Sequence, residues 1–267
     1  MTTLASLLSL QGRRALITGG AGHIALAAAE TLAELGASLV LVDRDAQRLE
    51  NVRESICANW PVVVTTIVCE LEDELARETM ISEVIAQCGD LDILVNNAAF
   101  AGTTDLRGWN EPFEAQSLET WRRAMEVNLT AGFHLSQAFL PLMRASERGS
   151  IINIGSIYGE LGPDWSLYEG TSMGNPAAYA ASKGGLLQLT RWLATTIAPQ
   201  VRVNAISPGG VQRGQPSSFV EKYVARTPMR RMAREDDFRG AIAYLAGDAS
   251  SYVTGQVMSV DGGWGVW

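Results

Sequence analysis

Short apolar runs alternate with longer helical patterns along almost the whole chain of 267 residues. The apolar runs predict strands at residues 14–18, 38–42, 62–68, 93–96, 150–154, 201–206 and 257–260. Patterns with helical periodicity predict helices at residues 24–35, 46–58, 72–88, 118–144, 177–197 and 236–245. Strands joined through helices favour right-handed crossovers and parallel pairing. We therefore expect one α/β domain over residues 1–267, a doubly wound seven-stranded parallel sheet with helices on both faces.

Charge and residue counts argue against several function classes. The formal net charge of -8, with no run of Lys or Arg, disfavours nucleic-acid binding, which needs clustered cations. No apolar run approaches the ~20 residues of a membrane span. The three cysteines, Cys57, Cys69 and Cys88, include no CxxC pair, which predicts buried, reduced thiols and a cytoplasmic protein. With only His23 and His134, we expect no metal site and no Ser/His triad.

A glycine-rich loop follows the first predicted strand directly and leads into a helix. Read from Gly20, it matches G-x-G-x-x-A. Glycines allow a tight turn and close approach of the backbone to a pyrophosphate, and the helix N-terminus adds a positive dipole end. This context predicts a dinucleotide bound as in a Rossmann fold, with contacts from Gly19, Gly20, Gly22, His23 and Ile24.

Asp43 ends the second predicted strand, 21 residues after Gly22. A carboxylate at this spacing accepts hydrogen bonds from an adenosine ribose and repels a 2′-phosphate, so NAD is the expected cofactor. Arg44 follows directly, and its guanidinium could stack on adenine or attract a phosphate, which leaves NADP open. Asp43 could also be an ordinary acidic residue of a turn.

Tyr179 and Lys183 stand four residues apart in a predicted helix, and Lys222 is the only other lysine of the chain. Arginine stays charged, whereas the pKa of a lysine ammonium can be tuned, so a lysine here indicates a role that arginine cannot fill. Positions i and i+4 share one helix face. The cation should lower the pKa of the phenol toward neutrality and allow proton transfer. The alternative is that both residues are surface side chains.

Several motifs together resemble the short-chain dehydrogenase/reductase family, from about Leu10 to Gly263. Besides the glycine loop and the Tyr179/Lys183 pair, they are Asn-Asn-Ala-Ala at residues 96–99, Asn128, Ser156 and Ser-Pro-Gly-Gly at residues 207–210. The resemblance implies that Tyr179 is the general acid/base and that Lys183 lowers its pKa and binds the nicotinamide ribose. It also implies that Ser156 steadies the reacting oxygen and that Asn128 holds a water linking Lys183 to solvent.

The same resemblance implies the cofactor contacts. Beyond the glycine loop, the expected residues are Asp43, Arg44, Glu70, Leu71, Asn97, Ala98, Ala99, Tyr179, Lys183, Pro208, Gly209 and Val211. His23 and Ala25 replace two of the family's usual glycines. Arg213 lies in the stretch where many members place a threonine against the carboxamide. Members of the family also commonly form tetramers, which implies a homotetramer through the helices predicted at residues 118–144 and 177–197.

Three segments are expected to bind the substrate: loops 100–117, 157–176 and 211–233. Ser156 and Tyr179 are 23 positions apart, wider than is usual in the family. The inserted segment and the loop containing Asp105 mix aromatic residues with carboxylates and hydroxyls, which favours a polar, sugar-like substrate. The same loops could instead build a contact between subunits. If the sugar carries a phosphate, it could be bound by Arg213, Arg226, Arg230 or Arg231.

We therefore expect an NAD-dependent oxidoreductase that interconverts a secondary alcohol and a ketone on a sugar-derived substrate. The loops also resemble, more weakly, those of oxidoreductases of bacterial surface-glycan and flagellin-sugar biosynthesis. A 3-oxoacyl thioester reductase is the alternative within the class, although Asp43 speaks against the NADP that such enzymes usually take. The alternative from another class is a dinucleotide-binding regulator without turnover. The presence of Ser156, Tyr179 and Lys183 together argues against it, because a regulator does not need to transfer protons.

Overall fold

A seven-stranded parallel sheet forms the centre of the molecule. The computed structural model describes residues 2–100 and 106–267. The strands are β1 (Arg14–Thr18), β2 (Ser38–Asp43), β3 (Val64–Val68), β4 (Ile93–Asn96), β5 (Gly149–Ile154), β6 (Val201–Pro208) and β7 (Val257–Val260). They lie in the order β3-β2-β1-β4-β5-β6-β7, and each pairs in parallel with its neighbours. The predicted fold class is confirmed.

Helices connect the strands, and polar residues fix where several of them begin. They are α1 (Leu4–Leu8), α2 (His23–Glu34), α3 (Ala46–Asn59), α4 (Glu74–Cys88), α5 (Leu118–Met125), α6 (Ala131–Ala145), α7 (Ala177–Thr196), α8 (Ser217–Arg226) and α9 (Arg239–Ala246). Asp45 caps α3 by accepting from the backbone N–H of Arg48, and Ser117 caps α5 in the same way. Such caps satisfy amides that the helix itself leaves unpaired.

The two faces of the sheet carry separate apolar cores because side chains alternate along each strand. In β1, Ala15 and Ile17 belong to the core under α2, α3 and α9. Leu16 points the other way, into the core formed with α4, α6 and α7. Burial on both faces explains why the strands read as continuous apolar runs in the sequence.

Two features of the helices differ from the prediction. The single helix expected over residues 118–144 is α5 and α6 joined by a π-helical segment, Glu126–Thr130. A π-helical segment adds a residue to one turn and is frequent at functional sites. Helix α8 lies inside the predicted loop 211–233 and has buried residues Phe219 and Tyr223. Its apolar positions face a local cluster away from the sheet, so the strand–helix alternation gave no sign of it.

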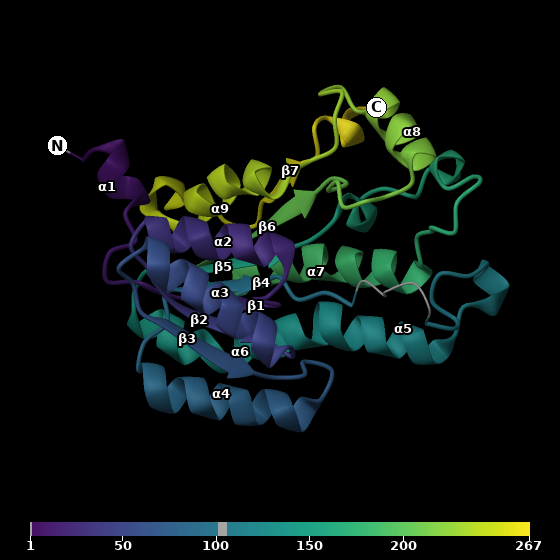
Figure 1. Ribbon diagram of the computed structural model, residues 1–267. Coiled ribbons are helices and arrows are strands. Elements are labelled where there is room, and N and C mark those ends of the chain that lie inside the picture. The colour runs from purple at the N-terminus through teal and green to yellow at the C-terminus, as the bar shows by residue number, and fades with distance from the viewer. Residues whose placement is uncertain (1, 101–105) are drawn as a thin grey trace.

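A third apolar cluster lies beyond the carboxyl end of the sheet and brings together segments that are distant in the sequence. It joins residues 157–176, α8 and the C-terminal turn, which lie together at one end of the molecule in Figure 1. Tyr223 and Trp264 stack with ring centroids 4.3 Å apart. Phe219 packs between Tyr168 and Tyr223. This cluster holds two of the three expected substrate segments together beyond the carboxyl end of the sheet.

Two further findings bear on the sequence analysis. Among the described residues, none of the helices combines the length and the apolar character needed to cross a membrane. The expectation of buried thiols is right for Cys69, whereas Cys57 is exposed and Cys88 is partly exposed. Cys57 lies on α3, which buries only Leu49 and Ile56. The prediction for Cys57 was therefore wrong because its position falls on the solvent side of that helix.

Candidate active site

One cavity of about 950 Å³ runs along the carboxyl edge of the sheet from the glycine loop to α7. Its walls include nearly all the residues predicted to act in catalysis or to bind the cofactor. These are Gly19, Gly22, His23, Ile24, Asp43, Arg44, Glu70, Leu71, Asn97, Ala98, Ala99, Ser156, Tyr179, Lys183, Pro208, Gly209 and Val211. Two predicted residues are not part of the described lining. Gly20 packs against Leu41 of β2, and Asn128 is buried behind the wall.

The glycine loop has the shape that a dinucleotide phosphate requires. Gly19 has φ +63°, and a Cβ at this position would lie 2.9 Å from Ala98 Cα. Thr18 Oγ1 accepts hydrogen bonds from the amides of Asn97 and Ala98, which fixes the end of β4 against the loop. In the described part of the chain, no side chain caps the N-terminus of α2 at Gly22. Its first amides are therefore available to an anion, and the residues present fit the phosphates of a dinucleotide.

At the adenosine end, a carboxylate and two arginines share the cavity wall. Asp43 accepts hydrogen bonds from the amides of Ala21 at 3.1 Å and Asp45 at 3.2 Å. Arg44 lies 3.5 Å from Glu70 and is largely exposed. Arg48 donates to the carbonyl of Ala21 at 2.9 Å and also lines the cavity. Arg48 was missed in the sequence because it lies in helix α3, one turn beyond the expected ribose site.

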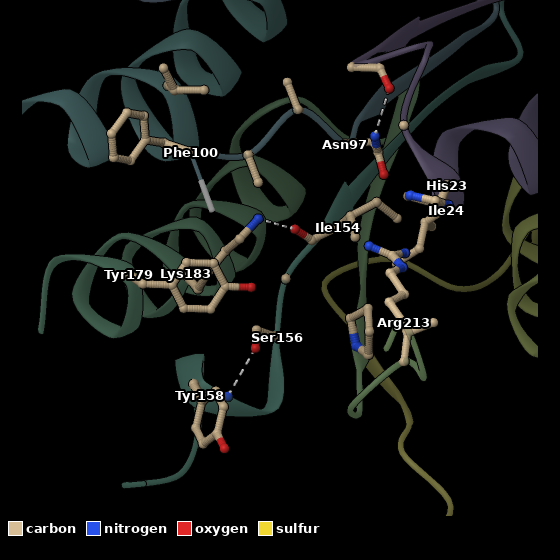
Figure 2. Close-up of a pocket in the computed structure, with 18 of the residues that line it drawn as sticks. His23, Ile24, Asn97, Phe100, Ile154, Ser156, Tyr158, Tyr179, Lys183 and Arg213 are labelled. Atoms are coloured by element: carbon tan, nitrogen blue, oxygen red, sulfur yellow. Dashed lines mark hydrogen bonds between the residues drawn. The ribbon is translucent and has the colours of Figure 1, made fainter. Parts of the chain in front are cut away.

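Tyr179 and Lys183 both reach the cavity from α7, as their spacing predicts (Figure 2). Lys183 is 2% exposed, and this burial lowers its pKa to about 8. Its Nζ donates to the carbonyl of Ile154 at 2.7 Å and lies 5.9 Å from the centroid of the Tyr179 ring. The lysine is thus a tunable cation, as expected.

The pKa of Tyr179 departs from the expectation. Burial raises it, while a hydrogen bond with Ser156 and the charge of Arg213 act in the opposite direction. The prediction that Lys183 brings this pKa toward neutrality is wrong for the structure described here. The physical reason is that the phenol is desolvated while the ammonium is directed at Ile154.

Ser156 follows β5 and lies beside the Tyr179 hydroxyl in Figure 2. Its Oγ accepts a hydrogen bond from the amide of Tyr158 at 3.2 Å. An amide can only donate, so the hydroxyl proton of Ser156 points to an acceptor in the cavity, which is the Tyr179 phenol in this structure and a substrate oxygen when one is bound. The serine and the tyrosine can therefore both reach one oxygen atom in the cavity.

Asn128 supports the site from within the π-helical segment. It is 2% exposed, its Oδ1 accepts from the amide of Phe100 at 2.6 Å, and its Nδ2 donates to Ser182 Oγ at 2.9 Å. Ser182 Oγ in turn donates to the backbone carbonyl of Tyr179 at 2.9 Å. This chain joins the end of β4 to the turn of α7 that carries Tyr179, so Asn128 is placed to position the phenol.

The charged residues of the expected substrate segments are mostly engaged away from the cavity. Arg226 pairs with Asp164 and lies over the Trp264 ring, and Arg231 pairs with Asp237. Of the four arginines proposed for a substrate phosphate, only Arg213 belongs to the described lining. It lies 3.2 Å from Glu235, and Figure 2 shows it extending toward His23 and Ile24. Asp105 lies outside the described residues.

The wall beyond Ser156 is more aromatic than the sequence predicted. Its side chains come from the inserted segment, from the turn after Ser156 and from the region of α8, namely Tyr158, Tyr168, Met173, Gln215, Phe219, Tyr223 and Met232. Tyr158 and Tyr168 carry hydroxyls that lie 2.6 Å apart. Their positions depend on packing between distant segments, and the signal in the sequence was only the wide interval between Ser156 and Tyr179. In the described ranges, no group of three or more His, Cys, Asp or Glu is placed to hold a metal ion.

Comparison with known proteins gives a consistent result over the full length. A family model described as "Enoyl-(Acyl carrier protein) reductase" matches residues 19–265. The chain is 36% identical to a tropinone reductase homolog of Arabidopsis thaliana, with 97% of this chain and 94% of the relative covered. It is 35% identical to galactitol 2-dehydrogenase (L-tagatose-forming) of Cereibacter sphaeroides, with 97% of each covered. A 3-oxoacyl-[acyl-carrier-protein] reductase of Thermotoga maritima is 32% identical over 95% of this chain and 98% of its own length.

Solved structures of the same shape hold nicotinamide dinucleotides of both kinds. A gluconate 5-dehydrogenase of Burkholderia cenocepacia in complex with NADP and tartrate superposes with a TM-score of 0.85, at 30% identity, covering 99% of this chain and 100% of that one. A xylitol dehydrogenase bound to NAD⁺ superposes with a TM-score of 0.84, at 30% identity, covering 95% of this chain and 99% of that one.

Proposed function

The chain belongs to the short-chain dehydrogenase/reductase family of NAD(P)-dependent oxidoreductases, and from that premise we propose that it interconverts a secondary alcohol and a ketone with Tyr179 as general acid/base. The observation that carries this proposal is the meeting of three groups at one wall of the cavity. Tyr179 and Ser156 face a common point, and Lys183 lies next to them. The same cavity continues to the glycine loop, so a substrate and a dinucleotide can meet in it.

Tyr179, Ser156 and Lys183 have different roles in proton transfer. When a nicotinamide dinucleotide is bound, it supplies or accepts the hydride. In the direction of alcohol oxidation, the phenol oxygen of Tyr179 takes the hydroxyl proton of the substrate, and in ketone reduction it returns one. Ser156 donates its hydroxyl proton to the same oxygen and stabilises the negative charge that develops there. Lys183, with a pKa of about 8, supplies a positive charge beside the phenol.

NAD is the preferred cofactor in this proposal. The Asp43 carboxylate lines the cavity and accepts from the amide of Ala21, which favours a ribose hydroxyl and disfavours a 2′-phosphate. Arg44 and Arg48 line the same wall, and their guanidinium groups can bind the 2′-phosphate of NADP once the charge of the Asp43 carboxylate is removed. The proposed preference therefore rests on the single negative charge of Asp43.

The substrate in this proposal is a small polar alcohol of the sugar or polyol kind. The hydroxyls of Tyr158 and Tyr168, together with Gln215 and Arg213, support a substrate with several oxygens. The name of the galactitol dehydrogenase relative agrees with this class. A 3-oxoacyl thioester is the second candidate, favoured by the apolar walls at Phe219 and by the reductase relative from Thermotoga maritima.

One experiment tests the reaction class. The purified protein is assayed with NAD and NADP on sugars, polyols, simple secondary alcohols and 3-hydroxyacyl thioesters, and the best substrate is then used with Tyr179→Phe. We expect this variant to keep its affinity for the dinucleotide and to lose at least ~100-fold in turnover, as removal of a general acid/base requires. Turnover of Tyr179→Phe close to that of the wild type would contradict the proposed role.

We further propose a homotetramer, located in the cytoplasm, that associates through α5, α6 and α7. Trp121 on α5, Phe133 on α6 and Trp192 on α7 are 39%, 43% and 56% exposed and offer apolar surface for a contact between subunits. Light scattering coupled to gel filtration measures the mass directly. Replacement of Trp192 by Arg should lower that mass if α7 forms the contact.

A further inference from the structure

Two tyrosine hydroxyls are hydrogen-bonded to each other at the end of the cavity beyond Ser156. Tyr158 and Tyr168 both line the cavity, and their hydroxyl oxygens lie 2.6 Å apart. Tyr158 comes two residues after Ser156, whereas Tyr168 comes from the segment that widens the interval before Tyr179. Figure 2 shows Tyr158 on the far side of Ser156 from Lys183. The pair is therefore separated from the point where the reacting oxygen is held.

The hydrogen bond between the two hydroxyls leaves one hydroxyl proton without an acceptor. Two phenols carry two hydroxyl protons, and the contact between them uses one. Within the part of the chain that the structure describes, neither hydroxyl has another hydrogen-bond partner. One O–H therefore remains without a protein acceptor in a region built largely from apolar side chains. Because both side chains line the cavity, a ligand that binds there without offering an acceptor leaves this donor unpaired, which costs free energy.

The environment keeps both phenols in the neutral, donating form. Burial is the main cause that raises the pKa of Tyr158, and the neighbouring Tyr168 adds to it. Burial likewise raises the pKa of Tyr168. The segment that carries Tyr168 is also held firmly, because Arg226 pairs with Asp164 and Lys222 donates to the carbonyl of Ser166 at 2.6 Å. The donor thus has a fixed position in the cavity.

We propose that Tyr158 and Tyr168 together determine specificity by donating a hydrogen bond to a second oxygen of the substrate, a hydroxyl or carboxylate set apart from the carbon that reacts. This inference rests on the proposed function and deepens it, because it says which alcohols the site prefers. A substrate with a methyl group at that place leaves the donor unpaired and is bound less well. The rule applies equally to a polyol and to a hydroxy acid, since both offer an acceptor oxygen.

Three ring alcohols of one shape test the proposal. They are cis-1,4-cyclohexanediol, cis-4-hydroxycyclohexanecarboxylate and cis-4-methylcyclohexanol, which differ only in the group opposite the reacting carbinol. We expect the wild type to oxidise at least one of the two oxygen-bearing compounds with a kcat/KM about tenfold above that of the methyl compound, the value of one neutral hydrogen bond. The double variant Tyr158→Phe/Tyr168→Phe should bring this ratio close to one.

The variants are chosen so that a structural effect is recognisable. Phenylalanine keeps the ring, and removal of both partners of a hydrogen bond is nearly neutral for folding. A loss of packing would lower activity on all three alcohols together and leave the ratio unchanged. Tyr168→Phe alone, which keeps one donor, should retain part of the preference, and it serves as the test if the double variant does not fold. Tyr252→Phe, at a fully exposed position, is the matched control.

The possible failures are distinguishable. An unchanged ratio in the double variant would overturn the role of the pair and leave the reaction class intact. The role of the pair would also be overturned if the wild type oxidised other secondary alcohols but none of these three. The same conclusion would follow if it oxidised the methyl compound best of the three. By contrast, full activity of Tyr179→Phe would contradict the proposed function itself.

Discussion

Lys183 Nζ donates a hydrogen bond to the carbonyl oxygen of Ile154 at 2.7 Å, which ties α7 to the last residue of β5. Among the residues that the structure describes, this is the one hydrogen bond of the buried ammonium, which carries three protons. Ile154 lies two residues before Ser156, so the lysine is fixed relative to the serine as well as to Tyr179. A buried lysine is destabilising when charged, so this side chain is held at a cost in stability.

The cost of this buried charge predicts a pH-dependent difference in stability between the wild type and Lys183→Met. Because the pKa of about 8 in the folded state is below the ordinary 10.5, the unfolded chain binds more protons between these values. The wild type therefore gains stability as the pH rises through that window. We expect Lys183→Met to have a higher free energy of unfolding than the wild type at pH 7. This difference should be about 1 kcal/mol smaller at pH 9.

Urea denaturation at the two pH values measures the difference. Lys222→Met, which removes the other lysine of the chain, whose side chain is 38% exposed, is the matched control. A gap between Lys183→Met and the wild type that stays constant or widens from pH 7 to pH 9 would show that the lysine is not held at a lowered pKa.

Asn128→Ala is expected to damage both stability and turnover. The substitution removes the acceptor of the Phe100 amide and the donor to Ser182, and it leaves buried polar groups unpaired. Losses of this kind cost about 2 kcal/mol in the free energy of unfolding. Turnover should fall because Ser182, which donates to the carbonyl of Tyr179, loses the Asn128 amide that donates to it. Ser182→Ala keeps the Phe100 contact and removes the contacts of Ser182 with Asn128 and with the Tyr179 carbonyl, so it should lower turnover as well. Equal stability of Asn128→Ala and the wild type would exclude this positioning role.

The fold was predictable because both signals that define it are local. Continuous apolar runs mark strands covered on both faces. The glycine loop marks the close turn that leads from β1 into α2. The break at Glu126–Thr130 was not predictable, because the helical pattern of the sequence does not mark where a single π-helical turn interrupts an α-helix. Asn128 lies at this break, so the irregular turn coincides with a residue that supports the site.

The site was predictable in its residues and less so in its contacts. Helical spacing placed Tyr179 and Lys183 on one face, but the pKa of each depends on burial and on partners such as Ile154. In the same way, four arginines were offered as possible ligands of a substrate phosphate, whereas Arg226 and Arg231 are paired with Asp164 and Asp237. The pairing of Arg226 depends on how α8 packs against the inserted segment, which no local pattern encodes.

Asp43→Asn tests the proposed cofactor preference without changing the shape of the side chain. The amide oxygen can still accept from the backbone of the glycine loop, while the negative charge is lost. We expect the ratio of kcat/KM for NADP to that for NAD to rise at least about tenfold, since Arg44 and Arg48 then face a phosphate without a competing carboxylate. Arg48→Gln added to this variant should remove part of the gain. An unchanged ratio in Asp43→Asn would mean that Asp43 does not contact the ribose.

Arg213→Gln should change the pH dependence of the reaction in a direction that follows from the structure. The charge of Arg213 acts to lower the pKa of Tyr179, opposing the effect of burial. Without it the pKa of the phenol rises, so alcohol oxidation, which needs the phenolate as base, should move to higher pH. Profiles of kcat/KM against pH measure the shift. Arg231→Gln, which removes an arginine paired with Asp237 outside the described cavity wall, is the matched control and should leave the profile in place. A profile of Arg213→Gln that is unchanged, or displaced to lower pH, would mean that Arg213 does not influence the catalytic phenol.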